Sequence, residues 1–377
     1  MNNISNKKKM MFDARSITRK PCGVRNVAEN YLSELCKYYD TIVLVNEDMV
    51  RTLDPELNAT IVPTRHSRFG FFSHIWVTYL VIKYKPDIFF SAHSSLPVLA
   101  ILPKKSIFVC HDLFASLDKT FFSKYGRLSF IPMIMFRILS ELSFLRASLV
   151  ISPSEKILES FKGLYIKASR TCVIHNGVNI DKSAIDFSKK RKEILFVGNF
   201  REYKGFNTLY SAWGILHKLE SLSDWRLNVV TNETKASIDI FINEYGAIPG
   251  ISFLSRVDDF NLKKIRSHSI ICVIPSNYEG FGIPLIESIA SGSYTIHSDI
   301  KVFSEILKGF DNFNIRSFPA GNAKDLGLSI LKVVENINNE DISDNFKRSG
   351  VLNKDRAEVM FSWGASANKA KDCINEK

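Results

Sequence analysis

Short apolar runs alternate with longer stretches in which apolar residues recur at helical spacing. In the first half of the chain we predict strands at Met10–Asp13, Thr41–Asn46, Asp87–Ser91, Ser106–Cys110 and Ser148–Ile151. Between the first two lies Val24–Cys36, whose apolar positions follow the period of a helix. Repetition of strand, turn and helix is typical of a parallel sheet with helices on both faces.

The same alternation begins again near Arg191. The predicted strands of this second series are Glu193–Gly198, Trp225–Thr231, Gly250–Leu254, Ile270–Ile274 and Tyr294–His297, and the predicted helices include Thr208–Leu219 and Pro284–Ser291. We therefore predict an α/β fold of two doubly wound domains, 1–182 and 183–355, with a final helix in 356–377 that packs back toward the first domain. Ligands of such sheets bind at the carboxyl ends of the strands, so facing domains would form a cleft there.

The length of 377 residues exceeds what one ordinary core holds, and 45% hydrophobic with 24% charged residues is typical of a globular protein. No apolar stretch is long enough for a signal peptide or a transmembrane helix, which predicts a cytoplasmic protein. The segment nearest to a membrane span is Phe130–Val150, which Arg137, Glu141 and Arg146 interrupt at helical spacing. It predicts an amphipathic helix, either buried in a domain core or lying on a membrane surface.

The net charge of +11 favours anionic partners, which could be nucleic acid, an anionic lipid surface or phosphorylated substrates. No aromatic-interleaved signature of RNA binding accompanies the charge, so no nucleic-acid partner is expected. One basic group, Arg15, Arg19, Lys20 and Arg25, surrounds a predicted strand-to-helix turn, where phosphates bind, whereas the run 189–192 is predicted to be a solvated connector.

The six cysteines have irregular spacing and form no C-x-x-C pair. This pattern argues against a zinc site and against a disulfide framework, and it fits a reducing cytoplasm. Cys110 and Cys272 lie within apolar runs, where small core residues are expected.

The segment Pro275–Ser288, PSNYEGFGIPLIES, combines a strand end, a glycine loop and a helix start. Gly280 and Gly282 allow a ligand to approach the backbone closely, and Pro284 suits the first position of a helix. The backbone N–H groups at such a helix start point toward a bound anion. Glu279 and Glu287 can each accept hydrogen bonds from vicinal hydroxyls, although acids at this place could also merely complement the helix dipole.

This segment resembles the E-x7-E region of retaining glycosyltransferase family 4, whose members have the GT-B fold of two Rossmann-like domains facing a central cleft. Further segments resemble the family in the same order, so the resemblance covers nearly the whole chain. They are Asp13–Leu35, which is similar to the mannosyltransferase-like branch, Val109–Leu113 (VCHDL), Ser152–Glu155 (SPSE), Val173–Asn179 (VIHNGVN), Phe196–Gly205 (FVGNFREYKG), Glu305 and Phe361–Ala365 (FSWGA).

The resemblance implies roles for individual residues. His111, Lys204 and Glu279 are the candidate catalytic residues: Lys204 neutralises the leaving diphosphate, Glu279 holds the donor sugar, and His111 lies in the cleft near that sugar. Asn199 stands where the family often has an arginine, and Arg201 is the candidate substitute. The full set of candidate donor-binding residues is Gly23, Arg201, Lys204, Glu279, Gly280, Phe281, Gly282, Ile283, Leu285 and Glu287.

Two of these residues have structural alternatives. His111 could serve only to pack the domain. Gly23, with Arg25 close by, is placed to approach the diphosphate but could also form an ordinary turn. No D-x-D motif and no metal-ligand spacing of histidines occurs, so no metal and no cofactor are expected.

The resemblance implies transfer of a hexose, with retention, from a nucleoside diphosphate sugar to a glycan or an undecaprenyl-diphosphate-linked acceptor. GDP-mannose or a UDP-sugar would be the donor, and the product would belong to lipopolysaccharide O-antigen, capsule or another surface polysaccharide. Such an enzyme would work at the inner face of the cytoplasmic membrane. The alternatives are a nucleotide-sugar epimerase or hydrolase of the same fold, and a non-catalytic polyanion-binding protein.

Overall fold

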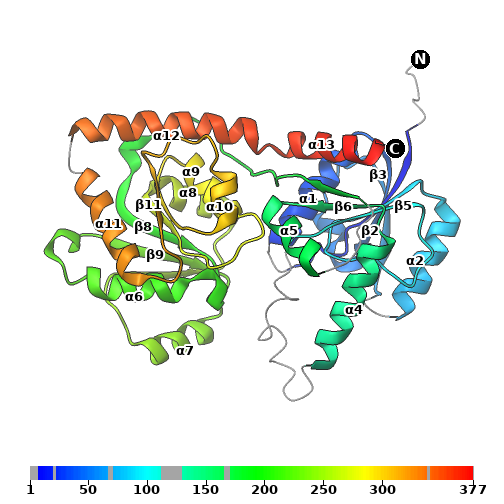
Figure 1. Cartoon of the computed structure of the whole chain (residues 1–377), viewed down its shortest axis with the longest axis horizontal. Coiled ribbons are helices and arrows are strands. Elements are labelled where there is room, and N and C mark those ends of the chain that lie inside the picture. The colour runs from blue at the N-terminus through cyan, green and yellow to red at the C-terminus, as the bar shows by residue number, and fades with distance from the viewer. Residues whose placement is uncertain are drawn as a thin grey trace. The chain divides into compact units, whose positions relative to one another are not determined.

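The computed structural model describes residues 7–19, 23–66, 71–111, 130–164, 170–337 and 340–376. The chain divides into two compact units, one of Met1–Gly177 with Phe361–Lys377 and the other of Val178–Met360. Each unit contains one sheet with helices packed around it (Figure 1). The prediction of two parallel α/β domains is therefore confirmed, and the last residues of the chain return to the first unit.

The sheet of unit 1 has seven strands in the order β3-β2-β1-β4-β5-β6-β7, and all neighbours pair in parallel. The strands are β1 (Lys9–Asp13), β2 (Asp40–Asn46), β3 (Ala59–Thr64), β4 (Ile88–Ser91), β5 (Lys105–Val109), β6 (Leu149–Ser152) and β7 (Thr171–Val173). The helices are α1 (Gly23–Leu35), the 3-10 helix η1 (Glu47–Thr52), α2 (Phe71–Tyr84), α4 (Phe130–Arg146), α5 (Glu155–Leu164) and α13 (Trp363–Asn375).

The direction of each crossover decides which face of this sheet a helix covers. The connection β1–α1–β2 steps toward one edge, whereas β3–α2–β4, β5–α4–β6 and β6–α5–β7 step toward the other. Because parallel crossovers are right-handed, α1 lies on one face, and α2, α4 and α5 lie together on the opposite face. The C-terminal helix α13 packs against α1.

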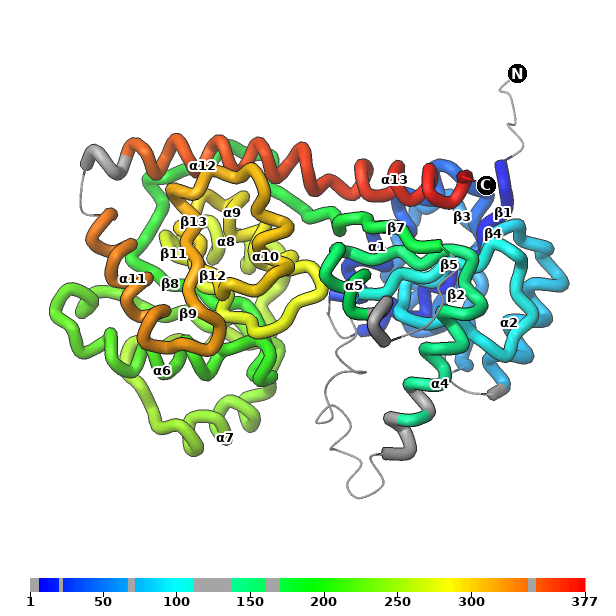
Figure 2. The backbone as a smooth tube through the Cα atoms, in the orientation of Figure 1, coloured from blue at the N-terminus to red at the C-terminus, as the bar shows by residue number. Residues whose placement is uncertain are grey.

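The sheet of unit 2 has the order β10-β9-β8-β11-β12-β13, again with parallel neighbours. The strands are β8 (Arg191–Val197), β9 (Arg226–Thr231), β10 (Ile251–Ser255), β11 (Ser269–Ile274), β12 (Tyr294–Ser298) and β13 (Ile315–Phe318). The helices are η3 (Phe187–Lys189), η4 (Glu202–Lys204), α6 (Phe206–Leu216), η5 (Glu220–Leu222), α7 (Lys235–Tyr245), α8 (Asp259–His268), α9 (Ile283–Ala290), α10 (Lys301–Ile306), α11 (Ala323–Ile337) and α12 (Glu340–Met360). Figure 2 traces the backbone through both units.

Three strands escaped the sequence prediction, namely β3, β7 and β13. β3 is an edge strand with several half-exposed residues and contains Pro63, which is tolerated there because an edge strand does not need every N–H. β7 is only three residues long, and β13 has the short sequence IRSF. None of them offers the continuous apolar run by which a buried central strand is recognised.

The FSWGA segment ties the end of the chain to unit 1. The Trp363 ring lies 5.8 Å from the Tyr31 ring in a T-shaped contact, and a Cβ atom at Gly177 would meet Trp363 at 2.4 Å. Glycine is therefore needed at position 177 because the indole occupies that space. Nearby, Cys172 of β7 and Cys373 of α13 form a disulfide with Cα atoms 6.9 Å apart. The irregular spacing, which argued against a disulfide framework, did not reveal this pair, since residues distant in sequence become neighbours in the fold.

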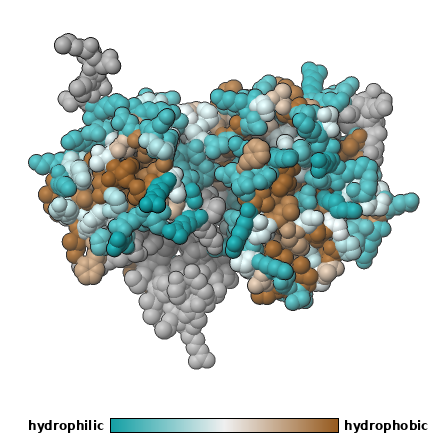
Figure 3. All heavy atoms as spheres, turned by 180° about the vertical axis from the view of Figure 1, so that it is seen from behind, coloured by the Kyte–Doolittle hydropathy of each residue, from teal (hydrophilic) through white to brown (hydrophobic). Residues whose placement is uncertain are grey.

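Apolar side chains also reach the surface of each unit (Figure 3). The segment Phe130–Val150 forms α4 and then enters β6, as the helical spacing predicted for its first part. Burial of this helix in the core is wrong for Ile134, Ile138, Leu142 and Leu145, which are all at least 36% exposed. Within the described part of the chain, no helix combines the length and the apolar character that crossing a membrane requires.

Candidate active site

Two loops at the carboxyl edge of the unit 2 sheet meet where its strand order reverses. β8 leads through α6 to β9 on one side, and its neighbour β11 leads through α9 to β12 on the other side. The loops that follow β8 and β11 therefore diverge, which leaves room for a ligand between them. The backbone N–H of Asn277 donates to the carbonyl of Tyr203 at 2.8 Å and so joins the two loops.

Two glycines make this arrangement possible. Gly205 has φ +67°, and a Cβ atom there would lie 1.9 Å from the carbonyl oxygen of Pro275. Gly282 has φ +99°, and its Cβ would meet the ring of Phe303 at 2.6 Å. Both positions combine a left-handed backbone with close packing, so a side chain at position 205 would push the two loops apart and one at position 282 would displace Phe303 of α10.

Lys204 and Glu279 meet between the two loops. The Nζ atom of Lys204 lies 2.7 Å from Oε1 of Glu279, and the side chains are 20% and 11% exposed. The same carboxylate oxygen accepts a hydrogen bond of 2.8 Å from Oγ of Ser276. A cation and a carboxylate that were predicted to serve the two ends of one donor molecule thus lie side by side.

Glu287 has a partner that the sequence did not reveal. The Nη2 atom of Arg266 lies 2.6 Å from Oε2 of Glu287, and the Arg266 side chain is only 6% exposed. Arg266 lies in the last turn of α8, on the chain just before β11. Nothing in its local sequence marks it, because a basic residue near the C-terminus of a helix is common. The contact fixes the orientation of a carboxylate that is still partly accessible.

The start of α9 offers backbone donors rather than side chains. Phe281 and Leu285 are buried, so any contact with a ligand would have to use their main chain. The N–H of Leu285 already donates to the carbonyl of Gly282 at 2.9 Å, and Pro284 has no N–H. The N–H groups of Gly282 and Ile283 precede this turn, at the end of the helix where an anion is stabilised.

The other end of α9 contacts a partly buried lysine. Lys190 donates to the carbonyls of Ser269 and Ser291 and to Oγ of Ser293 at 3.2, 2.9 and 2.8 Å. Burial lowers the pKa of the Lys190 ammonium to about 8. The prediction that the run 189–192 is a solvated connector is therefore wrong for Lys190, which binds a helix C-terminus.

Arg201 is exposed at the start of η4 in the loop after β8. Its backbone N–H donates to Oδ1 of Asn199 at 3.2 Å. Asn199 thus shapes the turn that carries Arg201 and Lys204, at the position where the family often has an arginine. Binding of a diphosphate by Arg201 stays a prediction.

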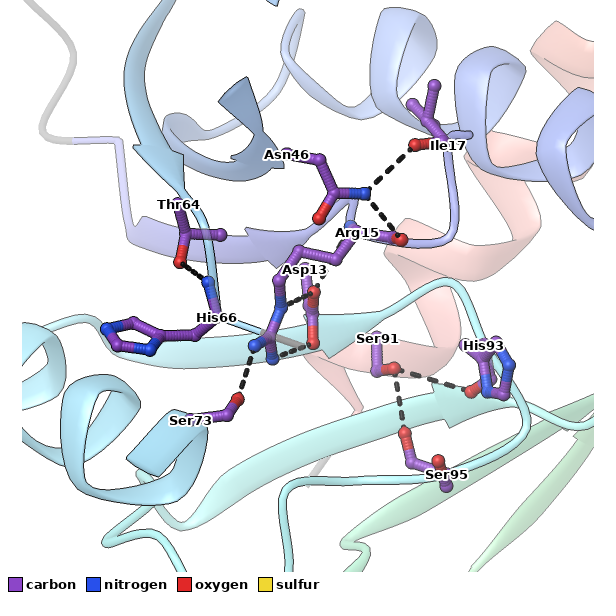
Figure 4. A network of polar contacts seen from close by, with 10 residues as sticks. All are labelled: Asp13, Arg15, Ile17, Asn46, Thr64, His66, Ser73, Ser91, His93 and Ser95. Atoms are coloured by element: carbon purple, nitrogen blue, oxygen red, sulfur yellow. Dashed lines mark hydrogen bonds and ion pairs between the residues drawn. The ribbon is translucent and has the colours of Figure 1, made fainter. Parts of the chain in front are cut away.

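In unit 1 the corresponding reversal of strand order lies between β1 and β4, and a buried ion pair occupies it (Figure 4). Arg15 donates from Nε and Nη2 to the two carboxylate oxygens of Asp13, both at 2.8 Å, and from Nη1 to Ser73. Burial by itself lowers the pKa of the Arg15 guanidinium, but the charge and hydrogen bond of Asp13 outweigh it and raise this pKa. Oγ of Ser91 donates to the carbonyl of Ser95 at 2.9 Å on the neighbouring strand end.

The predicted phosphate-binding group of basic residues is mostly neutralised within unit 1. Arg15 pairs with Asp13, Arg19 with Asp48 at 3.0 Å, and Arg25 with Glu29 at 2.8 Å. Lys20, like Asp112 of the VCHDL segment, lies outside the described residues. The expectation of a basic cradle at this turn is wrong for Arg15, which is fully committed to a buried carboxylate.

His111 and Gly23 belong to unit 1. His111 follows β5 and is 8% exposed, and its Nε2 lies 2.8 Å from the carbonyl oxygen of Ala92. Because a carbonyl can only accept, Nε2 carries the proton. Gly23 opens α1, and no protein atom lies within 4 Å of a Cβ built there. The protein itself thus does not require glycine at position 23, and its role toward a diphosphate stays a prediction.

Among the residues that the structure describes, no group of three potential metal ligands is gathered in one place. The expectation that the site works without a metal rests on the sequence and stays a prediction.

Two family models cover the chain in tandem. Residues 22–182 match the model described as Glycosyltransferase Family 4, and residues 178–349 match the model described as Glycosyl transferases group 1. The chain belongs to glycosyltransferase family 4. Lys204 and the segment Pro275–Ser288 lie within the second match, and His111 lies within the first.

Curated relatives of the glycosyltransferase include mannosyltransferases. The O-antigen chain mannosyltransferase RfbU of Salmonella typhimurium is 33% identical over 185 residues, which are 48% of this chain and 50% of that protein. The phosphatidyl-myo-inositol mannosyltransferase of Mycobacterium leprae is 27% identical over 170 residues, 43% of this chain and 44% of the relative. The matched part therefore spans about half the length of these relatives or less.

Solved structures show the same fold along the whole chain. The sucrose-phosphate synthase of Thermosynechococcus elongatus superposes with a TM-score of 0.75 at 15% identity and covers 97% of this chain and 98% of that one. The Anabaena protein HepE in complex with UDP and glucose superposes with a TM-score of 0.72 at 15% identity, covering 98% and 100%. The glycosyltransferase thus has the GT-B fold.

Proposed function

We propose that the protein transfers a hexose from a nucleoside diphosphate sugar to a glycan or lipid-linked acceptor, with retention of the anomeric configuration. This proposal rests mainly on the ion pair between Lys204 and Glu279, which precedes the glycine-lined start of α9. This arrangement places a cation, backbone donors and a carboxylate around one point, which suits a diphosphate that is joined to a sugar.

The reaction breaks the bond between the sugar C1 and the diphosphate oxygen. Negative charge develops on the leaving diphosphate, and Lys204, Arg201 and the N-terminus of α9 stabilise it. Glu279 accepts hydrogen bonds from hydroxyls of the donor sugar, and Glu287 accepts them from the ribose. His111 would support the donor sugar from unit 1. The leaving phosphate itself is the candidate base that takes the proton of the acceptor hydroxyl.

The comparisons favour two donor classes. Relatives are named as mannosyltransferases, which favours GDP-mannose, whereas the HepE structure holds UDP and glucose, which favours a UDP-sugar. We place GDP-mannose first because these relatives share more sequence with this chain. Neither a metal nor a further cofactor is part of the proposal, because the cationic charge needed at the diphosphate comes from Lys204 and Arg201.

For the acceptor we propose a glycan carried on undecaprenyl diphosphate, in the assembly of O-antigen, capsule or another surface polysaccharide. The name of the Salmonella relative supports this choice. The enzyme would then work in the cytoplasm, at the inner face of the membrane.

A thermal-shift screen of the purified protein against GDP-mannose, UDP-glucose and other nucleoside diphosphate sugars tests the donor half. A donor at a hundred times its Kd should stabilise the fold by about 2.7 kcal/mol. Glu287→Gln should lose this stabilisation, and Asn228→Ala, on a strand of the same unit, should keep it. Stabilisation by no nucleotide sugar would contradict the proposal, and addition of EDTA tests the expectation that no metal is needed.

The two alternatives predict other outcomes. A nucleotide-sugar epimerase or hydrolase of this fold would convert the donor rapidly without any acceptor, which product chromatography detects. A non-catalytic polyanion-binding protein would bind DNA in a salt-sensitive manner and show no affinity for nucleotide sugars.

A further inference from the structure

Helix α2 carries a continuous apolar stripe on its exposed side. Phe72, Ile75, Tyr79 and Ile82 are 71%, 54%, 57% and 60% exposed, and each follows the previous one by three or four residues. This spacing places them on one face of the helix. The opposite side of α2, with Val77 and Leu80, is buried in unit 1.

Helix α4 repeats the pattern. Ile134, Ile138, Leu142 and Leu145 follow one another by three or four residues and are 48%, 50%, 36% and 62% exposed. Ser143 and Phe144 of the same helix are buried. A helix that folds against its own sheet ordinarily exposes polar residues on the outside, so two apolar outer stripes in one unit need a separate explanation.

The segment between β4 and β5 joins the two stripes. The N–H of Ile101 donates to Oγ1 of Thr78 in α2 at 3.0 Å, and the N–H of Leu96 donates to Oγ of Ser143 in α4 at 3.0 Å. Leu99 and Ile101 of this segment are 62% and 59% exposed. Both helices lie on the same face of the sheet; Figure 2 shows their backbones. With the exposed side chains of all three elements, they form one apolar surface, which we call the α2–α4 face.

The charges that border the α2–α4 face are mainly positive. Lys83 and Lys85 follow the stripe of α2, Lys104 follows Ile101, and Arg146 ends α4; all four are exposed. Helix α2 contains no acidic residue, and in α4 the acidic residue is Glu141, which pairs with Arg137 at 3.5 Å. Apolar and aromatic side chains bordered by lysine and arginine are typical of surfaces that lie in the interface of an anionic bilayer.

We propose that the α2–α4 face docks on the surface of an anionic phospholipid bilayer. The charge at its border favours lipid headgroups over a neutral apolar partner, and the amphipathic ring of Tyr79 suits the headgroup region. The role of this docking rests on the proposed function: it would hold unit 1 at the membrane that contains a lipid-linked acceptor. The binding itself requires neither donor nor acceptor.

Flotation with vesicles of phosphatidylglycerol and phosphatidylcholine tests the proposal directly. The wild-type protein should float with these vesicles, less so at high salt, and more weakly with pure phosphatidylcholine. The double variant Ile82→Ser/Leu145→Ser replaces one exposed apolar side chain on each helix. It should bind these vesicles at least about tenfold more weakly than the wild type. Both residues are exposed, so the fold should persist, which the thermal unfolding midpoint checks.

A matched control is available in unit 2. Ile215 and Ile240 are 64% and 65% exposed, close to the 60% and 62% of Ile82 and Leu145. The double variant Ile215→Ser/Ile240→Ser should bind vesicles as the wild type does. Equal binding by all three proteins, or an equal loss in both variants, would overturn the proposal.

A second overturning result would be self-association. Sedimentation could show a wild-type dimer that Ile82→Ser/Leu145→Ser disrupts. If, in addition, neither protein floats with vesicles, the α2–α4 face is an interface between copies of this chain. Because the assay contains no sugar nucleotide, a protein that floats but transfers no sugar keeps this inference and contradicts the proposed function instead.

Discussion

Lys204 and Glu279 form a 2.7 Å ion pair between residues 75 positions apart in the chain. Each comes from a loop that follows one of two adjacent strands, and the pair is mostly shielded from solvent. Glu279 therefore holds the ammonium of Lys204 at the start of α9, where a diphosphate would also be attracted. In the proposed mechanism Lys204 then acts on charge that develops during the reaction.

Lys204→Met should lower kcat by about 10²–10³, because one preorganised charge at the leaving group is lost. Steady-state transfer kinetics with the donor found in the thermal-shift screen measure this. Lys192→Met is the control: Lys192 lies on β8 of the same unit and pairs with Asp224 at the surface. Transfer by Lys204→Met at the wild-type rate would rule out this role for Lys204.

Arg266→Met should raise the KM for the donor about tenfold, which corresponds to a loss of about 1.4 kcal/mol in the free energy of donor binding. The kcat should stay closer to the wild-type value, because Arg266 orients Glu287 and does not contact the leaving group in the proposed mechanism. Lys264→Met on the same helix removes an exposed charge and should change neither constant. Arg266→Lys should recover part of the affinity. If Arg266→Met lowers stability but leaves the KM unchanged, the contact with Glu287 serves only the fold.

Gly205→Ala should destabilise unit 2 and abolish donor binding, because a Cβ atom would lie 1.9 Å from the carbonyl oxygen of Pro275. Gly246→Ala is a matched control, since Gly246 has a comparable φ of +83° but no atom within 4 Å of an added Cβ. The control has an extended ψ of 151° and should cost only the strain of its own positive-φ backbone, about 1–3 kcal/mol. Urea denaturation and donor titration of both variants measure the difference, and equal behaviour would contradict the contact.

Lys190 should make the stability of unit 2 depend on pH. Its pKa is lowered by burial to about 8, whereas a lysine in an unfolded chain has a pKa of about 10.4. Between these values the unfolded chain binds a proton that the folded chain has released, so the free energy of unfolding should rise with pH from this group. Below about pH 8 both states are protonated, and the contribution no longer changes.

Urea denaturation at pH 7.5 and pH 9.5 checks this sign by comparison with Lys190→Met, which removes the titrating group. The free energy of unfolding of the wild type minus that of Lys190→Met should be larger at pH 9.5 than at pH 7.5. Lys189→Met, at an exposed neighbour, should behave as the wild type. The same pH dependence in all three proteins would show that Lys190 keeps its ordinary pKa.

The sequence by itself determined the parallel α/β organisation and the strand, glycine loop and helix start of Pro275–Ser288. Central strands buried on both faces are continuous apolar runs, and the loop from Glu279 to Pro284 depends on backbone geometry that glycine and proline encode locally. These are short-range properties, so they can be read along the chain. The strands that escaped prediction lie at sheet edges or are too short to show an apolar run.

Tertiary structure alone decided which charges meet and which helix faces remain uncovered. Arg266 beside Glu287, Arg15 beside Asp13 and Lys190 beneath α9 are contacts between elements whose distance in space no local pattern encodes. The α2–α4 face is of the same kind, because an apolar stripe in the sequence predicts burial until the sheet is seen to occupy the other side of the helix. The physical reason is that hydrophobic periodicity states which face of a helix is apolar, but not what covers that face.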